Sequence, residues 1–289
     1  MEDFMSKIKK FSQQKPLLFV LAVCVIYCLF LNIPSPQFSV FPDKMLREYL
    51  KELYNILWPV ALSLLFGFRF IYHRKGFGPT LMAGMFLIVL HTAILVLFLF
   101  DAVDNGVQWQ TTPAIFLGIL HMIGIGIREE VIFRGIIGNT LALKYATDKK
   151  GLWFAVIVSG LLFGGVHMNN IFHGVKLMGL VGQVVSACGS GLLLTAIYLR
   201  GGNIWVLMLT HALVDAGALL ESTFTVTTVT KVDAVSSQNP WGAVITVCMH
   251  TCVTLFLLRK SKQPAIFAQL EQLRNQAGWA EVPSCETEN

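Results

Sequence analysis

Several stretches of about 20 apolar residues constrain the fold of this 289-residue chain more than any other feature. A helix needs a run of about that length to cross a bilayer, whereas the buried helices of soluble proteins carry shorter apolar runs. Apolar residues make up 55% of the chain and charged residues only 13%, about half the charge of a typical soluble domain. The sequence therefore predicts an all-α, polytopic membrane helix bundle.

Apolar runs bounded by polar residues, glycine or proline predict about eight spans. They are 16–33, 53–72, 79–100, 112–143, 151–169, 175–199, 203–221 and 240–258. Between and after these spans the chain is more polar. Residues 34–52 are predicted to form an extended linker that leads into a short amphipathic interfacial helix. A polar loop is predicted for 222–239, and a soluble tail for 259–289. The run 16–33 is too long for a secretory signal and lacks a cleavage site, so we expect a retained span. This divides the chain into N-terminal membrane helices (1–111), a core (112–221) and a C-terminal part (222–289).

The distribution of charge predicts orientation and excludes some functions. The net charge of +5 is spread through short polar breaks and forms no basic domain, so nucleic-acid binding is not expected. Lysine and arginine collect in alternate breaks, on the side that includes both chain ends, which predicts that both termini are cytoplasmic. Five of the six cysteines lie in apolar runs, which indicates neither disulfides nor a zinc knuckle, and Cys285 is one residue too far from the end for prenylation.

Four charged residues, Arg128, Glu129, Glu130 and Arg134, lie within seven positions of the fourth predicted span. Ionisable groups inside a span are costly and usually face a bundle interior or a wet cavity. At 100° per residue, Glu130 and Arg134 lie one turn apart on one face and can form an ion pair, while Glu129 points elsewhere. Glu129 is therefore free to face a polar intramembrane cavity and accept a proton. The alternative is a structural charge cluster that binds neighbouring helices.

Two further spans carry polar residues that can reach this one. Phe163 and His167 share a helix face near the end of the fifth span. The midpoint between residues 129 and 167 falls in the polar break around residue 148, so an antiparallel hairpin sets Glu129 and His167 at the same depth. In the seventh span His211 and Asp215 lie one turn apart, so that both can bind one metal ion or Asp215 can orient His211.

The other intramembrane histidines have no carboxylate one turn away along the sequence. We therefore expect His91, His121 and His250 to act in packing or hydrogen bonding. The small-residue patterns that begin at Gly160 and Gly182 predict close contacts between helices.

Three motifs now stand in order along the chain: Glu129-Glu130-xxx-Arg134, Phe163-xxx-His167 and His211-xxx-Asp215. They resemble the EExxxR, FxxxH and HxxxN/D signatures of the CPBP family, which includes the Ras-converting CAAX prenyl endopeptidases and bacterial Abi-type proteins. The resemblance covers residues 112–221. It implies a helical bundle whose membrane-facing polar cavity hydrolyses a peptide bond in a membrane-associated peptide or protein.

The resemblance also implies a role for each motif residue. Glu129 and His167 would activate water, and His211 and Asp215 would stabilise the oxyanion or bind a metal. The supporting residues would be Glu130, Arg134 and Phe163. Asp215 departs from the asparagine of prenyl endopeptidases, because an ionised carboxylate cannot donate a hydrogen bond to an oxyanion.

That departure leaves two mechanisms open. One needs no firmly bound metal and is the one we favour, and the other uses a divalent ion such as zinc, held by His167, His211 and Asp215.

Two other functions compete with a peptidase. A non-catalytic scaffold or immunity protein could use the same fold to bind a membrane sensor or transporter, although such a protein has no evident need for a complete set of buried polar motifs. A proton-coupled transporter would be expected to show inverted repeats, which this sequence lacks. The resemblance and the compact size favour a bacterial cell membrane, and the sequence predicts neither the substrate nor the oligomeric state.

Overall fold

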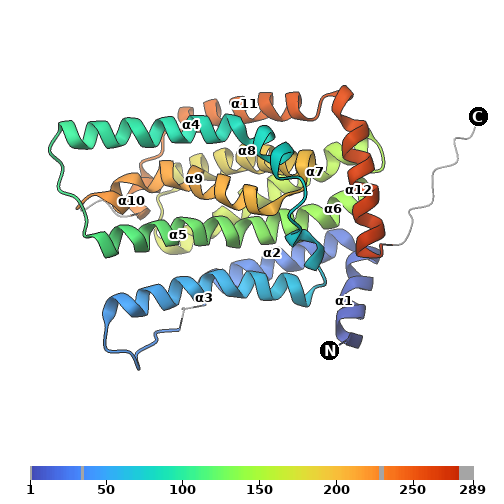
Figure 1. Ribbon diagram of the computed structural model, residues 1–289, viewed down its shortest axis with the longest axis horizontal. Helices are drawn as coiled ribbons and strands as arrows, with labels where there is room; N and C mark the ends of the chain where they lie inside the picture. The colour runs from blue at the N-terminus through green and yellow to red at the C-terminus, as the bar shows by residue number, and fades with distance from the viewer. Residues whose placement is uncertain (1, 34–35, 228–230, 280–289) are drawn as a thin grey trace, which may run out of the picture.

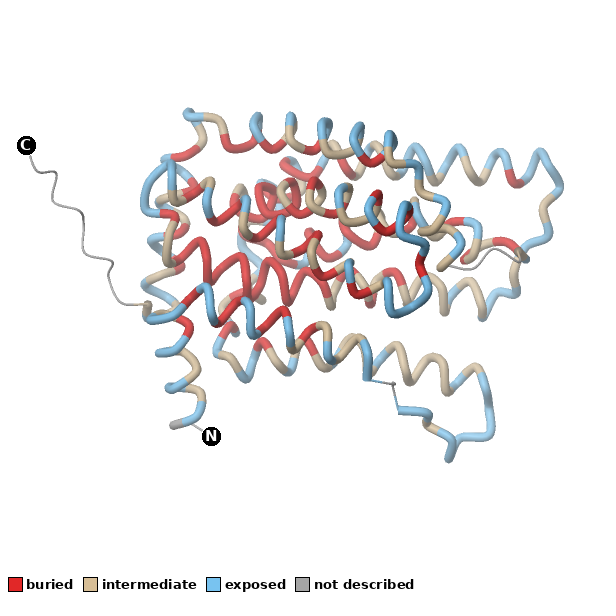
Figure 2. Tube along the Cα trace, turned by 180° about the vertical axis from the view of Figure 1, so that it is seen from behind, coloured by how far each residue is buried: buried red, intermediate tan, exposed pale blue. Residues whose placement is uncertain are grey.

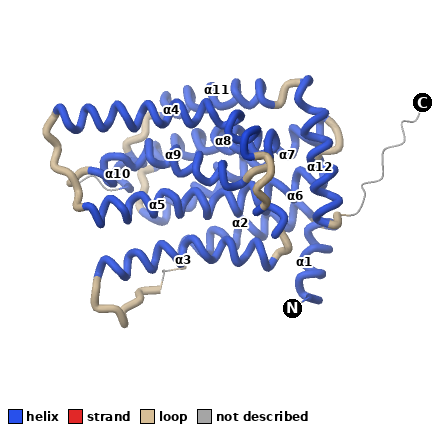
Figure 3. The backbone as a smooth tube through the Cα atoms, in the orientation of Figure 1, coloured by secondary structure: helices blue, strands red, loops and turns tan. Residues whose placement is uncertain are grey.

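The computed structural model describes residues 2–33, 36–227 and 231–279 (Figure 1). Every regular element in these ranges is a helix, and the one antiparallel bridge, between Trp109 and Thr225, is isolated (Figure 3). The predicted all-α fold is thus confirmed. Cys285 and the end of the predicted tail lie outside the described residues.

The elements follow one another as α1 (Glu2–Gln14), α2 (Pro16–Asn32), α3 (Lys44–Leu65), η1 (Arg69–Tyr72), α4 (Phe77–Asp104), α5 (Thr112–Glu130), η2 (Val131–Gly138), α6 (Asn139–Tyr145), α7 (Lys149–Val166), η3 (His167–His173), α8 (Leu177–Gly201), α9 (Ile204–Phe224), α10 (Lys231–Ser236), α11 (Pro240–Leu257), η4 (Lys260–Lys262) and α12 (Gln263–Ala277). The long helices run side by side, and α1 and α12 lie together at one end of the bundle (Figure 1).

Five helical stretches in the described part of the chain are long and apolar enough to cross a membrane: Phe77–Asp104, Lys149–His173, Leu177–Gly201, Ile204–Phe224 and Pro240–Leu257. The count becomes six if α1 and α2, bent by 118° from each other, are taken as one broken span. Helices α3 and α5 do not meet both criteria, although they lie alongside the others (Figure 1). The protein is therefore a multi-span membrane bundle, but the predicted count of eight is not confirmed.

Two predicted boundaries are wrong. The predicted interfacial helix and second span form one unbroken helix, α3, which starts after Asp43; the carboxylate of this residue accepts a hydrogen bond from the backbone nitrogen of Leu46 at 2.6 Å. Pro59 lies inside α3 without ending the helix. The predicted polar loop 222–239 contains the short helix α10.

Much of the predicted soluble tail is helix α12, which packs against the bundle. The guanidinium of Arg274 donates hydrogen bonds to the backbone oxygens of Ala142, Leu143 and Ala146 at 2.8–3.3 Å. These carbonyls lie at the C-terminal end of α6, where the last carbonyls lack the usual i+4 donors, so Arg274 caps the helix.

Glycines let the central helices approach closely, and the buried residues gather between them (Figure 2). A Cβ atom on Gly126 would lie 2.5 Å from the backbone oxygen of Met208, so only glycine fits where α5 crosses α9. A Cβ atom on Gly191 would lie 2.8 Å from the Cα of Gly160, so α7 and α8 approach closely at the small-residue pattern that begins at Gly160. These contacts bring the polar residues of α5, α7 and α9 together.

Candidate active site

Glu129 and Glu130 end α5 at the point where the helix widens into the π-helical segment η2. A π turn leaves carbonyls without their usual partners, and such turns occur frequently at functional sites. The side-chain amide of Asn139 donates to the backbone oxygens of Arg134 and Gly135, at 3.1 and 2.9 Å, which stabilises the widened turn. The regular helix predicted for this part of the fourth span is therefore interrupted by a π-helical segment.

Glu130 and Arg134 form the predicted ion pair. Arg134 Nη1 lies 2.8 Å from Glu130 Oε1, and both side chains are fully buried. Arg134 Nη2 also lies 3.4 Å from the backbone oxygen of Gly191, and its guanidinium carbon stands 4.4 Å from the centre of the Phe163 ring. A buried charge is tolerated when it is paired in this way, so the pair forms the rigid base of the site.

His211 rests on the same carboxylate. Its Nδ1 lies 2.5 Å from Glu130 Oε1. Because a carboxylate only accepts, Nδ1 carries the hydrogen, and Nε2 is left for other partners. His211 Nε2 lies 3.6 Å from Glu129 Oε2 and 3.8 Å from Asp215 Oδ1. The bond between His211 and Glu130 was not predicted, since residues 81 positions apart give no spacing signal.

His167 is the first residue of η3, directly after α7. Its Nδ1 lies 2.9 Å from the backbone oxygen of Phe163, and this carbonyl can only accept, so Nε2 is the free ring nitrogen. The Phe163 ring lies 5.2 Å from the ring of His167 and 5.8 Å from that of His211. Phe163 thus packs against both imidazoles and against Arg134.

Glu129 has two neighbours that sequence reasoning missed. The hydroxyl of Tyr27, from α2, donates to Glu129 Oε1 at 3.1 Å, and Tyr27 is almost completely buried. Arg128 Nη2 lies 4.0 Å from the same oxygen. Tyr27 stands in an apolar run with no other polar motif, and its contact bridges 102 positions, so the sequence alone does not reveal it.

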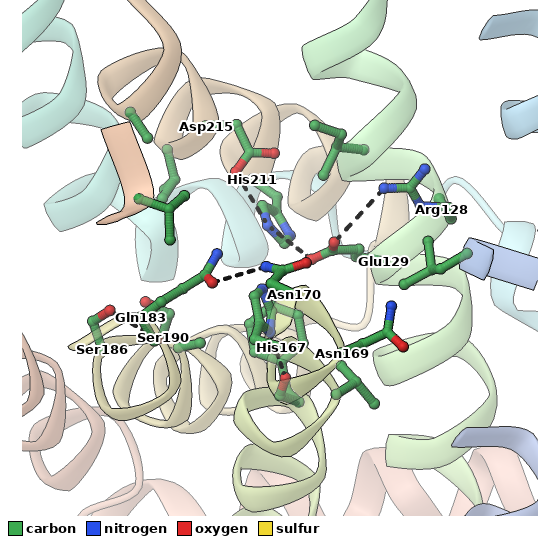
Figure 4. Close-up of a pocket in the computed structure, with 18 of the residues that line it drawn as sticks. Arg128, Glu129, His167, Asn169, Asn170, Gln183, Ser186, Ser190, His211 and Asp215 are labelled. Atoms are coloured by element: carbon green, nitrogen blue, oxygen red, sulfur yellow. Dashed lines mark hydrogen bonds and ion pairs between the residues drawn. The ribbon is translucent and has the colours of Figure 1, made fainter. Parts of the chain in front are cut away.

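A cavity of about 400 Å³ joins these groups (Figure 4). Glu129, His167, His211 and Asp215 all line it, and so do Arg128 and Phe163. The three sequence motifs, carried by α5, by α7 with η3, and by α9, therefore meet at one polar pocket. The common depth predicted for Glu129 and His167 agrees with this placement.

The three remaining intramembrane histidines are all hydrogen-bonded. His121 lines the cavity, and its Nδ1 lies 2.9 Å from Glu52 Oε1, which comes from α3. His91 Nδ1 lies 2.9 Å from the backbone oxygen of Leu87, outside the cavity lining. His250 Nδ1 lies 3.3 Å from the hydroxyl of Ser190.

The proposed metal ligands do not form a ready cluster. Within the described ranges, no three His, Cys, Asp or Glu side chains are grouped so that they could hold a metal ion. Glu130 engages only Nδ1 of His211, so the Nε2 atoms of His211 and His167 are the ring nitrogens that could bind an ion together with Asp215.

Comparison with protein families adds one independent finding. Residues 110–217 match the family model described as "Type II CAAX prenyl endopeptidase Rce1-like". This match assigns the segment to the CPBP family of CAAX-type proteases. The CPBP segment contains all three motifs and covers a little over a third of the chain. No curated protein and no solved structure matches the chain.

Proposed function

We propose that the protein is an intramembrane endopeptidase that hydrolyses a peptide bond in a membrane-associated peptide or protein, without a firmly bound metal. The observation that carries this proposal is the shared cavity into which Glu129, His167 and His211 project from three different helical segments (Figure 4). The family of the segment supports the same reaction class.

Glu129 is the general base. A water molecule in the cavity gives a proton to its carboxylate as the water oxygen attacks the carbonyl carbon of the substrate. His167, with Nδ1 bound to Phe163 and Nε2 free, accepts a hydrogen bond from the same water and orients it. Tyr27 holds one carboxylate oxygen of Glu129 at 3.1 Å, so the other oxygen faces the reaction.

His211 supplies the donor for the oxyanion. Its Nε2 lies 3.6 Å from Glu129 Oε2 and 3.8 Å from Asp215 Oδ1, so both carboxylates can stabilise an imidazolium that carries a proton on this nitrogen. Placed on Nε2, that proton can be donated to the oxyanion that forms when water attacks. Asp215, at 3.8 Å, keeps the ring in place, which is the role left to a carboxylate that cannot itself donate.

The proton taken up by Glu129 completes the reaction. As the tetrahedral intermediate collapses, the C–N bond breaks and the proton passes from Glu129 to the leaving nitrogen. The products are a new carboxyl and a new amine terminus. Glu130 and Arg134 do not touch the substrate in this scheme; they fix the imidazole of His211 from behind.

The proposal is tested by incubating the detergent-purified protein with a pool of peptides that carry a hydrophobic anchor, and identifying new termini by mass spectrometry. The wild type should cleave, and Glu129→Gln and His167→Ala should each be about 10²–10⁴-fold slower. His91→Ala is the matched control, because His91 makes the same backbone bond one turn back but does not line the cavity.

A chelator separates the two mechanisms, since cleavage should survive it if no metal is needed. If the wild type cleaves nothing, or if Glu129→Gln cleaves at the wild-type rate, the peptidase proposal fails and a scaffold becomes the better account.

A further inference from the structure

One wall of the cavity is built from side chains that the proposed chemistry does not use. Away from the catalytic groups the lining mixes apolar side chains with a set of amides and hydroxyls and the histidines His121 and His173. The amides and hydroxyls are those of Asn169, Asn170, Gln183, Ser186, Ser190 and Gln238. Such groups hydrogen-bond without imposing a charge, so this wall suits an uncharged, polar ligand.

The 3₁₀ geometry of η3 places Asn170 on the same side of the helix as His167, one turn further along. Residues three apart eclipse one another in a 3₁₀-helix, and three residues rise by about 6 Å. His167, Asn170 and His173 accordingly all line the cavity. An extended peptide rises by about 3.3 Å per residue, so Asn170 stands about two residues from the bond that His167 faces.

A hydrogen bond fixes the amide of Asn170 against α8. Asn170 Nδ2 donates to Gln183 Oε1 at 2.8 Å (Figure 4). The other two amide atoms, the oxygen of Asn170 and the nitrogen of Gln183, make no side-chain hydrogen bond within the described residues. Neither atom is fully buried, and both residues line the cavity. The pair therefore presents one free acceptor beside one free donor.

That combination is complementary to a peptide backbone. Each residue of an extended chain offers one N–H and one C=O, and both need partners when they leave water. We propose that Asn170 and Gln183 form a backbone-binding subsite, which holds an extended substrate segment about two residues from the scissile bond and favours uncharged side chains there. This inference rests on the proposed function for the bond being cleaved, but the binding itself does not require cleavage.

Binding is therefore measured in the Glu129→Gln background, where cleavage is slowed about 10²–10⁴-fold. The probes are fluorescein-labelled polyalanine peptides with a hydrophobic anchor, N-methylated at one backbone nitrogen at a time, and binding is followed by fluorescence anisotropy. N-methylation removes the backbone N–H from which the side-chain oxygen of Asn170 would accept a hydrogen bond. At one position along the peptide it should weaken binding about 3- to 10-fold, the worth of one neutral hydrogen bond.

The same N-methylation should have no effect at that position once Asn170→Ala is added. Gln183→Ala should weaken binding of every peptide by a similar factor, because the amide pair is lost. Asn105→Ala is the control, since this exposed amide bonds only within the end of α4, to Asp101.

A second variant separates loss of the subsite from a general folding defect. Asn170→Asp keeps the shape of the side chain and adds a negative charge, so it should shift preference toward peptides with lysine at the position identified by N-methylation. An asparagine whose side chain lies away from the bound peptide would not produce that shift.

The subsite is overturned if no peptide binds, or if N-methylation acts equally in the presence and absence of Asn170. If peptides bind as expected but the wild type does not cleave them, the subsite stands and the peptidase proposal fails.

Discussion

The buried ion pair at the base of the site makes the most quantitative prediction. Arg134→Met removes the guanidinium and leaves the fully buried carboxylate of Glu130 without its ion-pair partner, with His211 as its remaining donor. Breaking a buried pair by removing one partner costs about 3–5 kcal/mol. The stacking of Arg134 on Phe163 at 4.4 Å is lost as well, so we expect destabilisation in the upper part of that range.

Removing both charges should cost less than removing one. In the double variant Glu130→Gln with Arg134→Met, no charge of the pair is left unpaired, and the glutamine oxygen can still accept from His211. The two substitutions should therefore couple by about 2 kcal/mol or more. The conformational stability of each variant is measured by titrating dodecyl sulfate into mild-detergent micelles and following tryptophan fluorescence.

Arg259→Met is the matched control, because this arginine also stacks on a phenylalanine, Phe256, at 4.0 Å but lies outside the core. Its effect should stay within about 1 kcal/mol. Additive effects in the double variant, or an Arg134→Met protein as stable as the wild type, would refute the reasoning.

Three further outcomes follow from single contacts. Tyr27→Phe should slow cleavage about 3- to 10-fold without unfolding the protein, because Glu129 loses one donor; steady-state kinetics beside a thermal melt test it. Gly126→Val should destabilise the bundle and abolish cleavage, because its Cβ would meet the Met208 oxygen, and normal melting and activity would contradict this. Asn139→Leu should lower stability by about 1–3 kcal/mol, because the Gly135 oxygen and the Tyr198 hydroxyl lose the buried amide donor; the same micelle titration measures it, and an unchanged midpoint would speak against it.

Sequence reasoning was most successful where the physics is local. The i, i+4 spacing predicted the ion pair between Glu130 and Arg134, and it placed His211 and Asp215 on one face. The depth argument for Glu129 and His167 also needed only a hairpin and a helical rise. These inferences depend on spacing along one or two helices, which the sequence displays directly.

What was missed depends on contacts between distant segments. The approach of α9 to α5, permitted by Gly126, lets His211 reach Glu130, and the packing of α2 brings Tyr27 to Glu129. The unbroken helix α3 and the docked helix α12 were missed for a related reason. Charged residues at the start of α3 and in α12 indicated a membrane-interface helix and a solvent-exposed tail. Such residues can also lie in a long helix or cap a neighbouring helix, as Arg274 does.

The central claim is that groups from α5, η3 and α9 act together in one cavity. Single-turnover cleavage rates of Glu129→Gln, His167→Ala, His211→Ala and the triple variant test it most directly, with the fold of each variant checked by its melt. Residues that act as one unit are strongly non-additive, so the triple variant should be no more than a few-fold slower than the slowest single variant. Rate losses that multiply across the three sites would show that the groups work independently and contradict the account.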